Sequence, residues 1–329
     1  MQLQITSLLL LFGIFGVHAQ ESKAPIELKF PLACTLGEDC WTARYVSRGG
    51  ENRDFACKSR TQVGHKGTDF VIADIGRMQK GVAVLAAAKG RVKGVRNNEP
   101  DISIHGRSKD AIAGKECGNG VFLEHEDGWS TQYCHMKQGS ISVKVGDLVD
   151  VGTPIGEIGL SGETEYPHMH FSLRKDGARM DPFDGKLAET ACDAQIETSG
   201  LWSPSIAHSP MALVSASLSA APPTRTTVWQ APPKTISGEA PSLVLTGTVF
   251  GMRAGDKWHF KITRPDGHVF FENRKTFTKD KQFHYQFGGK KRPSGGFQKG
   301  VWTGQIMVER VLGRGETLYF QKDTSVIIE

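Results

Sequence analysis

Apolar residues in this chain occur in short alternating runs that Gly, Asp and Asn residues interrupt, and helical periodicity is scarce. The clearest runs cover residues 68–74, 81–95, 120–135 and 141–159. Alternation with a period of two is typical of half-buried strands, and Gly-Asp steps are typical of tight turns. The pattern predicts an antiparallel β core. Residues 186–221 depart from the alternation, and short helices are expected there.

A Pro-rich stretch, APPTRTTVWQAPPK at residues 221–234, precedes a second series of strand signals. Several runs within about 100 residues predict a small β-sandwich. The 329 residues are long enough for about two domains. We expect an all-β chain with five parts: a signal peptide (1–19), an N-terminal cysteine-containing segment (20–59), the antiparallel β-sheet core domain (60–200), a linker (201–234) and a basic C-terminal β domain (235–329).

The N-terminal sequence MQLQITSLLLLFGIFGVHAQ has an apolar core of roughly a dozen residues, followed by small residues before a cleavage point after Ala19. This length is typical of a secretory signal and is short for a membrane helix. No cysteine follows the cleavage point, which argues against a lipid anchor. We expect a periplasmic or secreted protein with no membrane span after signal removal.

Export changes the interpretation of the cysteines, because disulfides persist in oxidising compartments. The six are Cys34, Cys40, Cys57, Cys117, Cys134 and Cys192. Six cysteines allow 15 pairings. Cys117 and Cys134 flank a predicted hairpin around Asp127-Gly128 and are the first expected pair. No Cys-x-x-Cys pair occurs, so a cysteine-ligated zinc site is not expected.

Positive charge is concentrated in the C-terminal part. Residues 222–329 hold 17 Lys and Arg against nine Asp and Glu, whereas the whole chain is only +5. Such a domain could contact an anionic polymer, although a solvated basic surface explains the charge equally well. No nucleic-acid-binding motif is present, and nucleic acid is not an expected partner.

The segment TEYPHMHFSL, residues 164–173, carries two histidines, His168 and His170, separated by one residue. Side chains at i and i+2 lie on the same face of a strand, so these imidazoles should point the same way. The spacing fits two metal ligands, one ligand beside one acid/base group, or a surface pair without a role.

A second histidine motif lies upstream in GHKGTDF, where His65 precedes Asp69 by four residues. Imidazole and carboxylate ligands suit zinc, and a catalytic zinc has three protein ligands and one open position. His65, Asp69 and one member of the His168/His170 pair make such a set. His135, in QYCHM at the end of a predicted strand, could supply another imidazole. Zinc lowers the pKa of bound water, and imidazoles can move its proton, so the chemistry implied is hydrolysis of an amide-like bond.

The segments GHKGTDF, YCHM and GTPIGEIGLSGETEYPHMHFSLRKDG together resemble the lysostaphin/LytM-type zinc metallopeptidases, peptidase family M23. The resemblance covers about residues 60–183, and PLACTLGEDCWTARYV resembles an exported Gram-negative branch more loosely. It implies one Zn²⁺ per chain on His65, Asp69 and His170, with His135 and His168 as catalytic histidines. It also implies a narrow groove and cleavage within peptidoglycan peptides. If the basic C-terminal domain only anchors substrate, its deletion should weaken binding to whole cell wall and spare cleavage of short peptides. Ser172 stands where the family often has an acidic residue.

Three functions follow from these observations. The first is a zinc endopeptidase acting on peptidoglycan stem peptides or cross-links. The second is a non-catalytic wall-binding protein that regulates or activates other wall hydrolases and retains a metal site. The third is a carbohydrate-binding structural protein in which the basic C-terminal domain alone reproduces binding.

Overall fold

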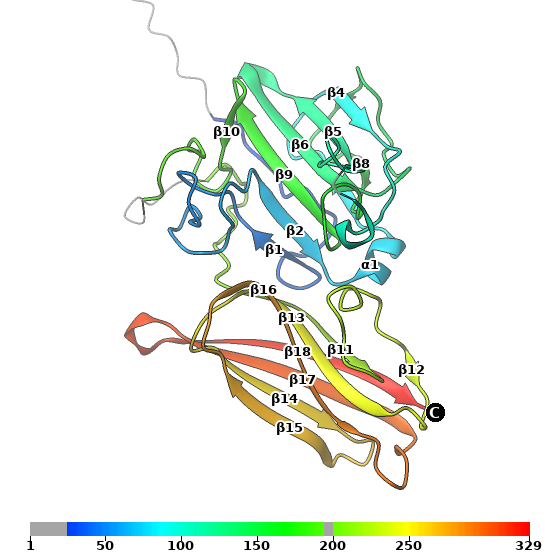
Figure 1. Cartoon of the computed structure of the whole chain (residues 1–329). Helices are drawn as coiled ribbons and strands as arrows, with labels where there is room; N and C mark the ends of the chain where they lie inside the picture. The colour runs from blue at the N-terminus through cyan, green and yellow to red at the C-terminus, as the bar shows by residue number, and fades with distance from the viewer. Residues whose placement is uncertain (1–24, 109, 194–199) are drawn as a thin grey trace, which may run out of the picture.

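The computed structural model describes residues 25–108, 110–193 and 200–329, which form two β units stacked end to end (Figure 1). The expected signal peptide, residues 1–19, lies outside the described residues. The chain is nearly all β, as the alternating pattern predicts, and its sheets are mainly antiparallel. Within the described residues, no helix is long and apolar enough to cross a membrane.

The N-terminal unit is built on an antiparallel sheet of eight described strands in the order β1-β2-β9-β6-β5-β4-β7, with β10 beside β9. Their bounds are β1 (Cys40–Arg44), β2 (Thr68–Ile72), β4 (Gly90–Arg96), β5 (Asn119–Glu124), β6 (Trp129–Met136), β7 (Leu148–Val149), β9 (His168–Lys175) and β10 (Ala178–Met180). A second small sheet pairs β3 (Ala83–Leu85) with β8 (Pro154–Glu157). One face of the large sheet packs on a core that contains Phe70, Tyr133 and Phe171.

Strand β9 lies between β2 and β6, and this order assembles the chemically interesting residues. Asp69 of β2 is the direct partner of His170 in β9, and Cys134 of β6 is its partner on the other side. Motifs that lie about 100 residues apart in sequence are therefore neighbours across adjacent strands. The sheet order, rather than any local motif, creates the site.

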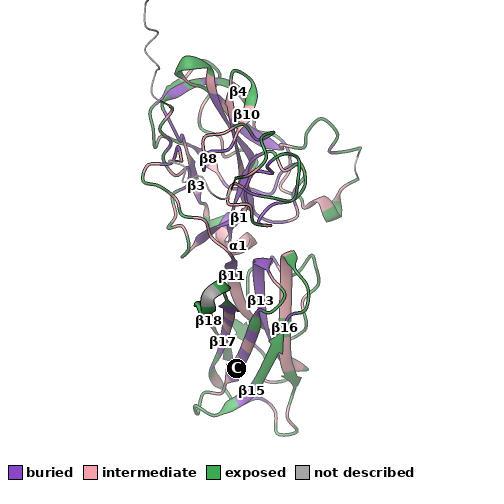
Figure 2. Cartoon of the chain, turned by 90° about the vertical axis from the view of Figure 1, so that its left-hand side faces the viewer, coloured by how far each residue is buried: buried purple, intermediate pink, exposed green. Residues whose placement is uncertain are grey.

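The C-terminal unit is a sandwich of two sheets, which agrees with the sequence prediction. The three-stranded sheet is β11 (Ala212–Ser219), β13 (Ser242–Met252) and β16 (Lys281–Lys291). The five-stranded sheet is β12 (Thr235–Ile236), β18 (Thr317–Ile328), β17 (Gly300–Val311), β14 (Lys257–Thr263) and β15 (Val269–Thr276). Trp258, Trp302 and Ile306 are among the residues buried between them. Strand burial is shown in Figure 2.

Two details differ from the sequence expectations. The α-helix of the described chain, α1 (Ile75–Lys80), is a six-residue turn whose Asp74 side chain accepts from the backbone N of Arg77 at 2.8 Å. The described residues 186–193 and 200–221 contain β11 and no helix, so the helix expectation is wrong there, and residues 194–199 lie outside the described residues. Strand β11 also falls inside the range expected as a linker, because its apolar residues pair with β13. Three further 3₁₀ turns cover Ile104–Gly106, Glu126–Gly128 and Gly313–Gly315.

The two units share a buried aromatic cluster. Tyr166, from the loop before β9, packs against Trp229 with ring centroids 4.9 Å apart and against Phe250 at 5.2 Å. Phe283 of β16 stacks on Trp229 at 5.4 Å. Trp41 of β1 belongs to the same cluster. We call these five residues the interdomain cluster, and their burial fixes the two units against each other.

The N-terminal segment is part of the first unit rather than an appendage. Leu28 and Leu32 lie in its core, and β1 extends its sheet. All six cysteines lie in described residues and form three disulfides: Cys34–Cys40, Cys57–Cys192 and Cys117–Cys134. The Cys117–Cys134 bond confirms the first expected pair.

Candidate metal centre and catalytic groove

His65 lies in the loop before β2, where Gly64 has a φ of +74°, a conformation that glycine adopts without strain. Its Nδ1 donates to the backbone carbonyl of Tyr45 at 2.7 Å, and its Nε2 lies 3.1 Å from Asp69 Oδ1. The carbonyl contact fixes the ring so that Nε2 is the nitrogen presented to Asp69.

His170 meets the same carboxylate from the neighbouring strand. Its Nδ1 lies 2.8 Å from Asp69 Oδ1, and its Nε2 lies 3.1 Å from the Ser172 hydroxyl. That hydroxyl donates in turn to the carbonyl of Lys66 at 3.3 Å and so accepts from Nε2. The relay leaves His170 Nδ1 free to act as a ligand. Nothing larger than glycine fits at Gly67, where a Cβ would lie 2.6 Å from His170 Nε2 and 2.3 Å from the Phe171 carbonyl.

His168 occupies the same face of β9, two residues before His170, as the strand spacing predicts. Its Nδ1 lies 3.0 Å from the Tyr166 carbonyl and 3.0 Å from the Thr164 hydroxyl. Its Nε2 is 3.5 Å from Asp69 Oδ1. The ring is nearly buried, and Nε2 is the nitrogen that faces the centre of the site.

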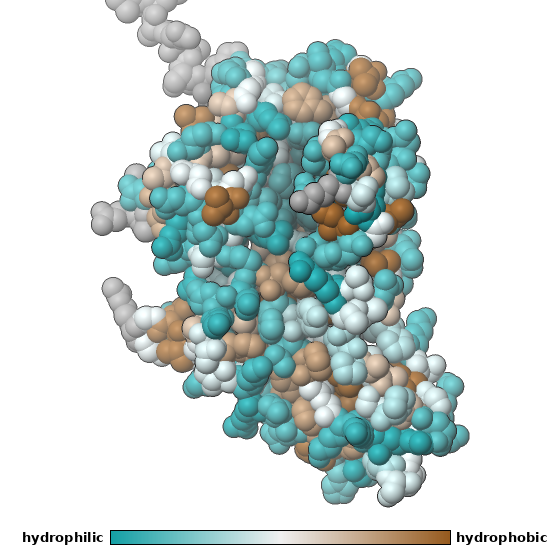
Figure 3. Space-filling model, in the orientation of Figure 1, coloured by the Kyte–Doolittle hydropathy of each residue, from teal (hydrophilic) through white to brown (hydrophobic). Residues whose placement is uncertain are grey.

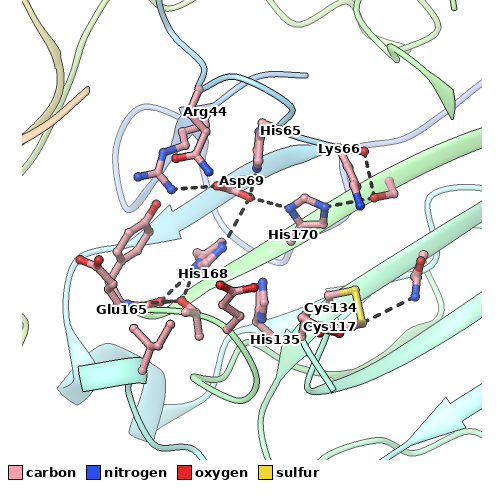
Figure 4. Close-up of a pocket in the computed structure, with 18 of the residues that line it drawn as sticks. Arg44, His65, Lys66, Asp69, Cys117, Cys134, His135, Glu165, His168 and His170 are labelled. Carbon is pink, nitrogen blue, oxygen red and sulfur yellow. Dashed lines mark hydrogen bonds and ion pairs between the residues drawn. A yellow bond between two sulfur atoms is a disulfide. The ribbon is translucent and has the colours of Figure 1, made fainter. Parts of the chain in front are cut away.

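His135 lies near the end of β6 at an irregularity in its pairing with β5, between Tyr133, which pairs with Val121, and Met136, which pairs with Asn119. It has a φ of +62°, an unusual conformation for a residue with a side chain. Its backbone N donates to the Cys117 carbonyl at 2.8 Å, and its Nδ1 donates to the Ser161 carbonyl at 2.8 Å. The ring centroid lies 4.7 Å from that of His168. Figure 4 shows His135, His168 and His170 around one space, with Asp69 reached from three sides.

Burial and charge set the protonation of these groups. Burial lowers the pKa of His135 well below its usual value, and the neighbouring His168 and His170 add to the effect. Burial also lowers the pKa of His170. Burial alone would raise the pKa of Asp69, but the surrounding imidazoles, His65 first among them, hold it well below its ordinary range. The site therefore combines an ionised Asp69 with neutral imidazoles at His135 and His170, and a metal ion requires its carboxylate and imidazole ligands in these states.

The donor set fits a zinc ion. Ligand atoms of His65, Asp69 and His170 all lie within 4.8 Å of one another. Two imidazoles and one carboxylate make a recognised zinc set that leaves a position open. The remaining nitrogen of each histidine is held by a carbonyl or hydroxyl, as is usual for zinc ligands. The other group of potential ligands in the described residues, Cys34, Asp39 and Cys40, contains a disulfide, which removes both thiolates.

The site opens into a groove with a cavity of about 530 Å³. Figure 3 shows this face of the upper unit hollowed between hydrophilic surfaces. Besides the five predicted residues, the cavity wall includes Arg44 from β1, whose Nη1 lies 3.7 Å from Asp69 Oδ2, and the buried Tyr166. Burial raises the pKa of the Tyr166 hydroxyl, which keeps it protonated.

The structure thus brings His65, Asp69, His135, His168 and His170 into one pocket. Sequence reasoning missed Arg44 and Tyr166. Arg44 carries no local motif, because only the pairing of β1 with β2 brings it beside Asp69. Tyr166 belongs to the segment 164–173 that holds the histidine pair, and nothing in the local sequence indicated a role of its own.

Comparisons with known proteins agree with this geometry. The family model described as Peptidase family M23 matches residues 63–182. The cell division protein DipM of Caulobacter vibrioides is 31% identical over 112 residues, which are 32% of this chain and 16% of DipM. The peptidoglycan DD-endopeptidase ShyC of Vibrio cholerae is 27% identical over 118 residues, which are 36% of this chain and 22% of ShyC.

Among solved structures, the catalytic domain of lysostaphin from Staphylococcus simulans matches at 26% identity with a TM-score of 0.27, covering 36% of this chain and 77% of that domain. The chain spans between 16% and 34% of the length of the curated relatives it matches.

Fold and site together define an antiparallel β protein with a His-Asp-His pocket whose donor atoms fit a metal ion. More particularly, residues 63–182 match the model of Peptidase family M23, a family of zinc-dependent metallopeptidases.

Proposed function

We propose that this protein is an exported zinc metalloendopeptidase that hydrolyses peptide bonds in peptidoglycan stem peptides or cross-links. The observation that carries the proposal is the convergence of the three ligand atoms within 4.8 Å, with two more anchored histidines in the same pocket. One zinc ion per chain would be held by His65, Asp69 and His170. Bound there, it would polarise the scissile carbonyl and lower the pKa of a water molecule.

Two histidines of the chain would carry out proton transfer and charge stabilisation. His168 and His135 each donate Nδ1–H to a backbone carbonyl, so Nε2 of each ring is the nitrogen that faces the pocket. His168 Nε2 is placed to take a proton from the attacking water, since it faces Asp69 at 3.5 Å. His135 lies beside it and can hold charge on the reacting oxygen or return a proton to the leaving amine.

The substrate class and location rest on the relatives. ShyC is a peptidoglycan DD-endopeptidase, and DipM is a cell division protein. Three disulfides and the predicted signal support export to a periplasmic or extracellular compartment. A protein in such a compartment would meet peptidoglycan, whose peptides could enter the groove that contains the histidines.

The proposal is tested by incubating purified full-length protein with sacculi of defined chemistry and measuring released muropeptides by mass spectrometry. We expect release that a chelator abolishes and zinc restores. His170→Ala should lose both metal and turnover, whereas His168→Ala should keep metal and lose turnover. Full activity in both variants would disprove the assignment, and bound zinc without turnover on any sacculus would support the regulator instead.

A further inference from the structure

A second cavity lies between the two units and continues the catalytic groove. It has a volume of about 340 Å³. Arg44, Glu165 and Tyr166 line both cavities. The other walls of the second cavity come from Arg225, before β12, and from Phe283, His284 and Tyr285 of β16. A peptide lying in the groove would therefore reach the C-terminal unit at this point.

Two hydrogen-bond donors at the junction of the cavities have no partner among the described residues. They are Arg44 Nε and the Tyr166 hydroxyl. Tyr166 is only 3% exposed, and the Arg44 guanidinium carbon lies 5.8 Å from its ring centroid. A buried donor without an acceptor is costly, so such groups in a cavity wall indicate a ligand that accepts from them.

The balance of charge at the junction favours an anion. Glu165 is neutralised by a two-point contact with Arg225, at 3.2 Å and 2.6 Å, and lies 3.4 Å from His105 Nε2. Asp69 is engaged by His65, His168 and His170. Arg44 therefore retains positive charge that its 3.7 Å contact with Asp69 only partly offsets. Arginine donors match the geometry of a carboxylate.

Contacts between the N-terminal and C-terminal units fix the walls of this second cavity. Trp229 O accepts from the backbone N of Ile75 at 2.9 Å, and Tyr166 and Phe283, which line the cavity, belong to the interdomain cluster. Phe283 and Tyr285 add aromatic surface beside the charged groups. A subsite with fixed walls can discriminate between ligands at little cost in ordering.

Resting on the proposed function, we propose that the interdomain cavity is a substrate subsite that binds a free carboxylate of the peptide through Arg44 and Tyr166, with the C-terminal unit forming its far wall. The C-terminal unit then contributes to substrate selection directly and is more than an anchor to the cell wall.

The test uses full-length His168→Ala protein loaded with zinc and pairs of stem-type peptides that differ only in whether one carboxylate is free or amidated. Calorimetry should show the free carboxylate binding about tenfold more tightly, since charge-assisted hydrogen bonds contribute about 1.5–3 kcal/mol. Adding Tyr166→Phe, which keeps the ring stack, should reduce this preference several-fold. Adding Arg44→Gln should abolish it, with zinc content measured in each variant. Arg274→Gln, at an exposed arginine, is the matched control.

Equal affinity for free and amidated peptides, or a preference that survives both substitutions, would overturn the subsite. This readout does not depend on turnover. A native chain that binds carboxylate peptides with the stated preference but hydrolyses none would reject the proposed function and leave the subsite standing.

Discussion

At the scale of the residue, the site depends on how each imidazole is held by its second nitrogen. Backbone carbonyls hold His65, His135 and His168, whereas His170 depends on a side chain, Ser172. A carbonyl cannot be removed by substitution, but a hydroxyl can. Ser172 is therefore the accessible point at which ligand orientation can be tested without touching a ligand.

Ser172→Ala should weaken zinc affinity about tenfold or more, which is the usual cost of removing an outer-shell partner of a metal-bound histidine. Zinc affinity is measured by competition with a chromophoric chelator. Ser172→Glu should restore affinity, because a carboxylate also accepts from Nε2. Ser325→Ala, at an exposed serine of β18, is the control. Unchanged affinity in Ser172→Ala would show that the relay to the Lys66 carbonyl is dispensable.

A second residue-scale prediction concerns Asp181, which is fully buried beside Arg48 and Asp184. Burial, together with Asp184, raises the pKa of Asp181 from 3.8 to about 8. Between those values the unfolded chain ionises this group while the folded chain does not. Unfolding therefore releases a proton, and the free energy of unfolding falls as the pH rises through that window.

Asp181→Asn should remove this pH dependence, because asparagine does not titrate. Its side-chain oxygen can still accept the hydrogen bond that the Phe183 backbone N donates to Asp181 Oδ1 at 2.9 Å in the native chain. Urea unfolding at about pH 5 and about pH 9 should show a smaller loss of stability in the variant than in the native chain. Asp150→Asn, at an exposed aspartate, should behave like the native chain. An equal loss of unfolding free energy between these pH values in Asp181→Asn and in the native chain would contradict the raised pKa of Asp181.

The sequence predicted the five central residues because their spacing carries chemistry: an i, i+4 pair in a Gly-rich loop, and two histidines on one strand face. It could not predict Arg44 and Tyr166, since their proximity depends on strand order and on packing against a second unit. The choice of His170 over His168 as the ligand came from family resemblance. In the structure, His170 Nδ1 lies 2.8 Å from Asp69 Oδ1 and His168 Nε2 lies 3.5 Å from it, and the choice of ligand stays a prediction.

At the scale of the element, β6 and its disulfide position His135. The Cys117–Cys134 bond closes a 17-residue separation, and the Cys117 carbonyl accepts from the His135 backbone N. The strand prediction succeeded here because alternation is strong. The helix prediction failed at residues 186–221 because the apolar run of β11 is completed by β13, a partner that the local sequence does not reveal.

Replacing Cys117 and Cys134 by serine should lower the free energy of unfolding by about 3 kcal/mol, by loop-closure entropy. Peptide hydrolysis under conditions where the variant is still folded should also fall, because His135 loses its support. The control is the double serine variant of Cys34 and Cys40, a six-residue separation, which should lose about 2 kcal/mol and keep its rate. Equal rates of peptide hydrolysis in both variants would show that the Cys117–Cys134 bond contributes to stability alone and does not position His135.

At the scale of the whole molecule, the interdomain cluster connects the C-terminal unit to the loop before β9, the strand that carries His168 and His170. Tyr166 packs its ring on Trp229, while its carbonyl holds His168 at 3.0 Å. The expectation that losing this unit would spare cleavage of short peptides therefore needs revision. These observations do not support the predicted contact of its basic surface with an anionic polymer. They do support a structural role for its apolar face.

Trp229→Ala should cost about 3 to 5 kcal/mol of stability and should also lower kcat on short soluble peptides, because Tyr166 loses its packing partner. Denaturant unfolding and peptide hydrolysis below the transition measure the two effects. Trp302→Ala, in the core of the sandwich, is the matched control and should lower stability while leaving kcat unchanged. An unaltered kcat in Trp229→Ala would show that the two units act independently.

The position of Tyr166 also sets a limit for protein engineering. Hydrolase modules are often treated as cassettes that can be fused to new targeting domains. Here the ring of a residue adjoining the catalytic strand is embedded in aromatic surface from β13, β16 and the preceding loop. A chimera that keeps residues 25–203 and changes the rest would need to recreate that surface.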